Sequence, residues 1–139
     1  GALKPALRRL EFNDFIATRK MMSDGGKLSV YYSTTKKGLQ ELKRRTLEKL
    51  SDNPLQFNTN AKIKLACAEF LDYEERKQLF FDLKSLAMNF KVCAQKILED
   101  EYTDKNFYQK ILLDNTICEY SNLITIIEGF EKDNERYRK

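Results

Sequence analysis

The fold is decided by residues 73–137, which read YEERKQLFFDLKSLAMNFKVCAQKILEDEYTDKNFYQKILLDNTICEYSNLITIIEGFEKDNERY. Apolar residues recur every three or four positions on both sides of Tyr102-Thr103-Asp104, the spacing of one face of an α-helix. The segment therefore predicts a long C-terminal hairpin of two amphipathic helices. Helices of this length bury their apolar stripes against other helices, so we predict an all-α fold.

The predicted hairpin carries helix start signals. Asp72 and Glu75 are spaced like the two partners of a capping box, so a helix should begin at Tyr73. Thr103 or Asp104 is expected to cap the last helix, which would continue to about residue 137. The stripe of the first of these helices is nearly heptadic and consists of Leu79, Leu83, Leu86, Phe90, Cys93 and Ile97.

Three shorter helices are predicted before the hairpin. They run from about Pro5 to Met22, from Thr35 to Leu50, and from a cap at Asn58 or Thr59 to about residue 71. The segment Leu28 to Thr35 has strand propensity, and we leave open whether it is helix, turn or strand, because a lone short strand would have no partner. The whole chain, residues 1–139, is thus expected to form one up-and-down bundle of about five helices.

Length and composition agree with a folded domain. The chain has 139 residues, of which 42% are hydrophobic and 33% charged, so it lacks the low hydrophobicity of disordered segments. The longest apolar run, from Leu65 to Ala68, is four residues, which excludes a membrane span of about 20 residues. Because it opens with Gly1 and Ala2 and ends in a charged run, we expect a segment of a larger protein, with these two residues left from cloning.

The residue types argue against catalysis. The chain has no histidine, which excludes Ser/His/Asp and Cys/His couples, histidine-ligated zinc and the Glu-x-x-His di-iron site. The carboxylate pair Glu74 and Glu75 lies at a helix end among solvated charges, where a raised pKa is not expected. We therefore expect no enzyme, no cofactor, no metal site and no small-molecule substrate.

The three cysteines predict a compartment. Cys67, Cys93 and Cys118 match no metal-ligand spacing, and each falls on or beside an apolar stripe. We interpret them as reduced core thiols. A reducing compartment, cytoplasm or nucleus, is then expected.

Charge is distributed unevenly along the chain. Residues 1–50 hold 12 Lys and Arg against 5 Asp and Glu, whereas residues 51–139 hold 13 against 16. A basic patch on the second predicted helix consists of Lys36, Lys37, Lys43, Arg44, Arg45 and Lys49. Further basic residues precede it, namely Lys4, Arg8, Arg9, Arg19 and Lys20, and Tyr31 and Tyr32 could stack on bases.

Three interpretations of the basic patch stay open. It could be a solvated face, a surface for a protein partner, or a site for a phosphate backbone or an anionic lipid surface. Glu41 and Glu48 interrupt the patch, which argues against the last of these.

Aromatic residues of the hairpin suggest a partner surface. Tyrosine is enriched at interface hot spots, and a last helix of this length should extend beyond its own bundle. The candidates for contact with a protein partner, or for a continuing coiled coil, are Phe130, Tyr137, Tyr102 and Tyr108.

We accordingly predict a non-catalytic protein–protein interaction module of an intracellular protein, acting as an adaptor, tether or assembly domain. Its partner would be another protein or a second copy of the chain. The alternative is a helical domain that binds nucleic acid or an anionic membrane surface through its basic N-terminal helices.

Overall fold

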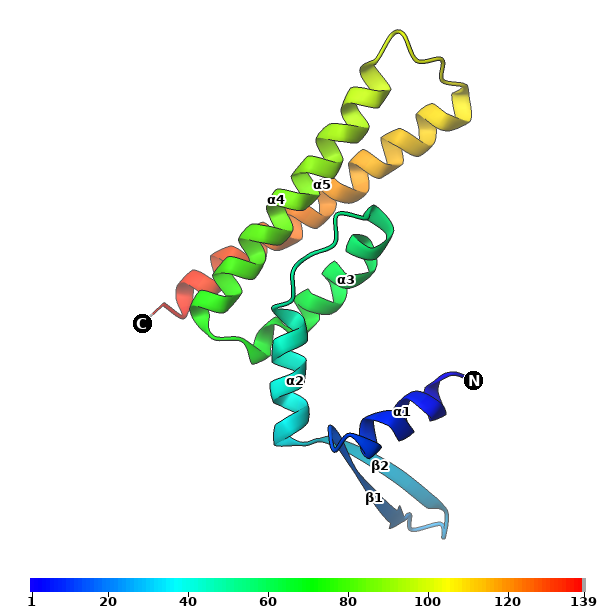
Figure 1. Cartoon of the computed structure of the whole chain (residues 1–139), viewed down its shortest axis with the longest axis vertical. Coiled ribbons are helices and arrows are strands. Elements are labelled where there is room, and N and C mark those ends of the chain that lie inside the picture. Colours follow the sequence, from blue (N-terminus) through cyan, green and yellow to red (C-terminus); the bar gives the residue numbers. More distant parts are fainter. Residues whose placement is uncertain (139) are drawn as a thin grey trace. The chain divides into compact units, whose positions relative to one another are not determined.

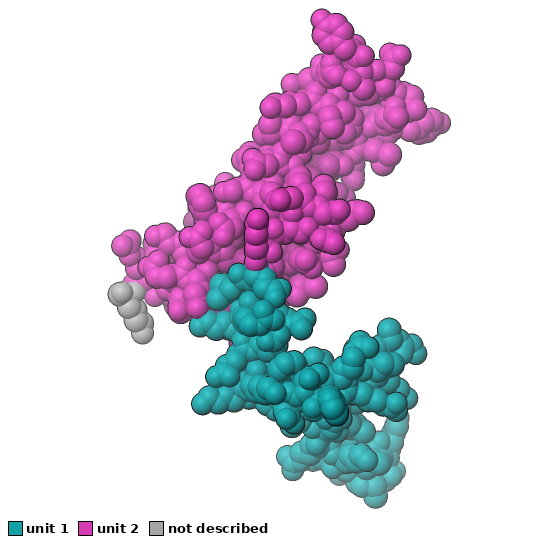
Figure 2. All heavy atoms as spheres, viewed as in Figure 1, with its two compact units in different colours: residues 1–48 teal, residues 49–139 magenta. Residues whose placement is uncertain are grey.

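The computed structural model describes residues 1–138 and combines helices with a two-stranded antiparallel sheet (Figure 1). Its internal contacts divide the chain into two compact units (Figure 2). Unit 1 comprises Gly1–Glu48 and unit 2 comprises Lys49–Lys139.

Unit 1 is built from two helices and a β-hairpin. Helix α1 spans Leu3–Phe12, strands β1 and β2 span Ile16–Met22 and Leu28–Thr34, and helix α2 spans Lys36–Thr46. The strands pair in antiparallel register from Ile16 opposite Thr34 to Met22 opposite Leu28. Gly26, at a φ of 76°, gives the loop between them the left-handed backbone that a tight connection needs.

The hairpin corrects two predictions, because the fold is not all-α and the first helix does not reach Met22. Helix α1 ends at Phe12, and two residues later Asp14 takes a φ of 59°, which a continuing α-helix does not allow. Residues 16–22 then become the missing partner of residues 28–34. The undecided second segment is a strand, as its β-branched and aromatic residues favour.

The turn between α1 and β1 also contacts the start of α2 through hydrogen bonds. The Thr35 hydroxyl donates to the carbonyl of Asp14 at 2.6 Å and accepts from the amide of Gly38 at 2.9 Å, so it caps α2 as well. A Cβ on Gly38 would lie 1.9 Å from the Phe15 carbonyl oxygen. Hydrogen bonds and this close approach therefore join α1, the hairpin and α2 at one point of unit 1.

Unit 2 consists of helix α3 (Pro54–Ala66), a 3-10 turn (Ala68–Phe70) and the long helices α4 (Tyr73–Glu99) and α5 (Phe107–Arg136) (Figure 1). The capping box predicted at the start of α4 is confirmed. The last helix is capped by Asn106, two or three residues after the predicted caps. Helix α3 begins earlier than predicted, because Asn53 caps it and Pro54 occupies its first turn.

The core of unit 2 lies where α3 covers the middle of the α4–α5 hairpin. Phe57, Leu83 and Ile127 are fully buried there, and the ring of Phe57 lies 5.2 Å from that of Phe90. Adjacent aromatic rings at this distance add to the burial of their apolar surface. The base of the hairpin is fixed by the Tyr73 hydroxyl, which donates to a Glu135 carboxylate oxygen at 2.8 Å and thereby raises the pKa of Tyr73.

The cysteines are placed differently from the prediction. Cys93 and Cys118 are exposed and Cys67 is half-buried, so the first two are not core thiols. They sit on the flanks of their apolar stripes, which helical spacing alone did not separate from the centre. Separately, within residues 1–138 no helix combines the length and the apolar character needed to cross a bilayer.

Candidate nucleic-acid interface

The outward face of α1 is basic. Lys4 and Arg8 are one helical turn apart and therefore adjacent on the helix surface. Arg9 flanks them, and all three are exposed, whereas Ala6 and Leu7 are half-buried on the other side. Leu3 and Phe12 are exposed as well, so the solvent-facing surface of α1 carries both basic and apolar side chains.

The β-hairpin carries further basic residues on both of its faces. Arg19 lies directly opposite Tyr31 in the register, so their side chains are neighbours on one face. Lys20 lies opposite Val30 on the other face, and Lys27 is in the loop. The basic side chains are therefore spread along the strands and around the loop.

The hairpin is tied to α1 by more than the chain connection. The Thr18 hydroxyl donates to the Glu11 carboxylate at 2.7 Å, and the Phe15 amide donates to the Leu10 carbonyl at 2.9 Å. Together with the Thr35 contacts, these bonds fix the basic faces of α1 and the hairpin within one unit.

The predicted patch on α2 is partly neutralised. Arg44 forms ion pairs with Glu41 at 2.8 Å and Glu48 at 2.9 Å, and Arg45 pairs with Glu41 at 2.7 Å. The two guanidinium groups lower the pKa of Glu41 to about 2, and the two carboxylates raise the pKa of Arg44. These acidic residues were visible in the sequence as interruptions, and the structure gives them direct partners.

The lysines of the predicted patch are in different settings. Lys37 donates to the Asn13 carbonyl at 2.9 Å and lies over the Phe15 ring, so it supports the turn after α1. Lys36 is exposed at the start of α2, and Lys43 is half-buried on the same helix. Lys49 follows α2 and belongs to unit 2.

Most cations of unit 1 are unpaired. Unit 1 holds 11 Lys and Arg against 5 Asp and Glu, a formal charge of +6. In the part of the chain that the structure describes, seven of those 11 make no side-chain ion pair or hydrogen bond. They are Lys4, Arg8, Arg9, Arg19, Lys20, Lys27 and Lys36. All of these except Lys27 were among the basic residues that we selected from the sequence.

The aromatic candidates all lie in unit 2 and are well separated along it. Tyr102 is fully exposed in the loop after α4, and Tyr108 is exposed in the first turn of α5. Phe130 stacks on Phe80, with ring centroids 5.9 Å apart, and Tyr137 is exposed at the end of α5. The structure thus does not gather them into one surface, and their role as partner contacts stays a prediction.

Comparison with known proteins identifies no family. No family model and no curated protein sequence matches the chain. The chain is similar to the solved structure of Bacillus subtilis PadR in complex with operator DNA, with 16% identity and a TM-score of 0.44. The similarity covers 96% of this chain and 78% of that chain.

Our first-ranked functional prediction is corrected by the fold. We expected an adaptor, tether or scaffold with a coiled-coil extension, a role that we inferred from an all-α bundle, whereas the chain contains a β-hairpin. The all-α prediction had also left out the β-hairpin, and with it the basic unit that the hairpin completes. The exposed, unpaired cations of that unit favour the alternative prediction, nucleic-acid binding.

Proposed function

We propose that the chain binds double-stranded nucleic acid through the basic faces of α1 and the β-hairpin. The observation that carries the proposal is the set of seven unpaired cations on elements that share one hydrogen-bonded junction. Phosphate contacts supply most of the affinity of such complexes, and they need cations that are not already neutralised.

The dimensions of unit 1 support a duplex as the ligand. The major groove of B-DNA, about 12 Å wide, admits one α-helix or a two-stranded β-ribbon. Helix α1 has 10 residues and directs Lys4 and Arg8 outward, so it can lie along the groove with these side chains toward the phosphates at its edges. The hairpin, with Lys20 and Lys27, would then lie along the flanking phosphates.

A binding assay tests the proposal with a charge-matched control. Fluorescence anisotropy would measure the affinity of the chain for a mixed-sequence duplex, first for the variant Arg8→Gln/Arg9→Gln. We expect the affinity to fall roughly tenfold or more, because two phosphate contacts are lost. Lys110→Gln/Lys132→Gln, which removes the same charge from exposed positions of α5, should change it less than about twofold. Equal losses of affinity in both variants would mean that only the net charge of the chain matters, which would contradict the proposed interface.

The salt dependence gives a second measure. Neutralising phosphates releases counterions, so the logarithm of the affinity should fall linearly with the logarithm of salt concentration. Removing Arg8 and Arg9 should make this slope shallower by about two units, since each phosphate contact contributes roughly one unit. An unchanged slope would mean that neither side chain touches a phosphate.

An anionic membrane surface is the second candidate, and the hairpin tip favours it. Met22 and Leu28 lie opposite each other beside the loop, and both are more than half exposed. Apolar side chains next to Lys27 could enter the headgroup region of a bilayer. Sedimentation with phosphatidylserine vesicles separates the candidates: Met22→Ser/Leu28→Ser should abolish vesicle binding under this hypothesis and leave duplex affinity unchanged under the first.

The remaining expectations fit a nucleic-acid-binding role. We propose that the chain acts without catalysis of its own and in a reducing compartment, cytoplasm or nucleus. Three free cysteines among the described residues support the choice of compartment.

A further inference from the structure

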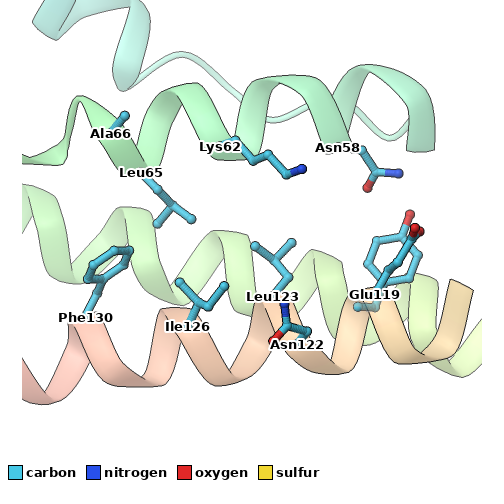
Figure 3. Close-up of a pocket in the computed structure, with 10 residues that line it drawn as sticks. Asn58, Lys62, Leu65, Ala66, Glu119, Asn122, Leu123, Ile126 and Phe130 are labelled. Atoms are coloured by element: carbon cyan, nitrogen blue, oxygen red, sulfur yellow. The ribbon is translucent and has the colours of Figure 1, made fainter. Parts of the chain in front are cut away.

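Unit 2 contains a groove between α3 and α5 that the nucleic-acid proposal does not use (Figure 3). Its volume is about 680 Å³, within the range of roughly 300 to 1,000 Å³ that small-molecule sites occupy. Helix α3 lines one wall and α5 the other, so both walls belong to one unit.

One half of the groove is apolar. Leu65 and Leu123 point into it from opposite helices, and Ile126 and Phe130 continue the α5 wall (Figure 3). Ile126 is 44% exposed and Phe130 is 42% exposed. A hydrocarbon placed along this wall would remove apolar surface from water at a gain of about 25 cal/mol per Å².

The other half offers hydrogen-bond donors without partners. Tyr120 is 5% exposed and lines the groove, yet its hydroxyl makes no hydrogen bond in the described part of the chain. Lys62, from α3, likewise has no ion pair or side-chain hydrogen bond among residues 1–138. Figure 3 shows Lys62 and Asn58 on the α3 side of this half. Because Tyr120 lines the groove, a ligand oxygen placed there would give this hydroxyl an acceptor.

We propose that the groove binds an amphipathic organic carboxylate. The carboxylate accepts from the Lys62 ammonium and the Tyr120 hydroxyl, and the hydrocarbon body lies on Leu123, Ile126 and Phe130. This inference concerns unit 2 alone and does not rest on nucleic-acid binding by unit 1.

The charge of the groove favours a monoanion over a dianion. Lys62 is the one cation among the residues that line it, and Glu119 places a negative charge at the same end. A phosphate dianion would be repelled by Glu119 and would have a single cation to balance it. The Glu119 carboxylate already accepts from the Asn115 amide at 3.1 Å, so it is less available to a ligand ammonium than Lys62 is to a carboxylate.

Calorimetric titration of the whole chain with octanoate tests the proposal. We expect saturable binding at one site, and binding about tenfold weaker to Lys62→Met, because a charge-assisted hydrogen bond is lost. Glu119→Gln should bind octanoate more tightly, because a like charge is removed. Lys110→Met, on the exposed surface of α5 outside the groove, is the matched control and should bind as the parent chain does.

The same titration with octylamine and 2-amino-octanoate decides between head groups. If octylamine bound more tightly than octanoate and Glu119→Gln weakened its binding, the preferred ligand would be a cation and the proposal of a carboxylate would be wrong. If 2-amino-octanoate bound more tightly than octanoate, and both Lys62→Met and Glu119→Gln weakened its binding, the preferred ligand would be a zwitterion and the proposal of a simple carboxylate would be wrong. Absence of saturable octanoate binding to the folded parent chain would overturn the site.

Filling the groove with a larger side chain tests whether octanoate binds there. Ile126→Trp places a larger side chain over the α5 wall and should abolish octanoate binding while the thermal melt stays cooperative. Tyr120→Phe removes the hydroxyl and keeps the ring in the core, so it should weaken octanoate without a matching loss of stability. Unchanged affinity in both variants would show that octanoate binds elsewhere.

Discussion

At the scale of single residues, unit 1 depends on one glycine. A Cβ on Gly38 would lie 1.9 Å from the Phe15 carbonyl oxygen and 2.9 Å from Thr34 Cγ2. The Phe15 carbonyl cannot move easily, because it accepts from the Thr35 amide at 3.1 Å. The absence of a side chain at this position is therefore what allows α2 to start against the turn after α1.

Gly38→Ala should consequently destabilise unit 1 by about 1 to 3 kcal/mol, the usual effect of overpacking a close contact. Gly129→Ala is the matched control, since Gly129 lies within α5 with no atom within 4 Å of an added Cβ. That change should stabilise α5 by roughly 0.5 to 1 kcal/mol. Amide hydrogen exchange of β1, β2 and α5 in the two variants measures both effects, and equal protection of the hairpin in Gly38→Ala and the parent chain would contradict the close approach.

At the scale of elements, a helix could be predicted from the sequence where its cap residues and its apolar periodicity agree. The Asp72 and Glu75 capping box and the stripe after it identified α4, because cap and periodicity agreed over a long segment. The hairpin was missed because residues 16–22 share an apolar pattern with the end of α1. What separates them is Asp14 in the left-handed region, and a backbone conformation of that kind leaves no periodic signal.

The same limit applies to the candidate site. The sequence contains the cations of the N-terminal segment in plain view, yet we predicted the main patch on α2, where Glu41 pairs with Arg44 and Arg45. It could not identify which cations stay unpaired, because that depends on side-chain contacts. The exposed cations of α1 and the hairpin were visible as residue types and became a candidate surface only once the strands were paired.

The cap of α4 gives a prediction at this scale. Asp72 accepts from the amide of Glu75 at 2.9 Å, and the Glu75 carboxylate accepts from the amide of Asp72 at 3.0 Å. Asp72→Ala should lower the free energy of unfolding by about 1 kcal/mol, and Asp72→Asn by less, since asparagine also caps well. Urea denaturation followed by circular dichroism measures both. Equal losses for the two variants would indicate that the carboxylate charge, and not the capping bond, stabilises the helix.

At the scale of the whole molecule, stability and the proposed nucleic-acid binding belong to different units. The fully buried side chains lie in unit 2, whereas the unpaired cations lie in unit 1. Leu83→Ala should destabilise the chain by roughly 2 to 5 kcal/mol through the cavity that it leaves. Duplex affinity, measured at a temperature where the variant is still folded, should remain within about twofold of the parent chain. A tenfold loss in the folded variant would mean that unit 2 contributes to the interface.

Unit 1 keeps its fold with little side-chain packing, which affects how freely its surface residues can be substituted. Its α1 and its two strands contain no buried residue, and its shape is held by the backbone-directed bonds around Thr35 and by the bare backbone of Gly38. Outward positions such as Arg8, Arg19 and Tyr31 are therefore not committed to packing. Several of them can be substituted together without loss of the fold. A new binding preference could therefore arise here without a compensating stabilising substitution elsewhere in the chain.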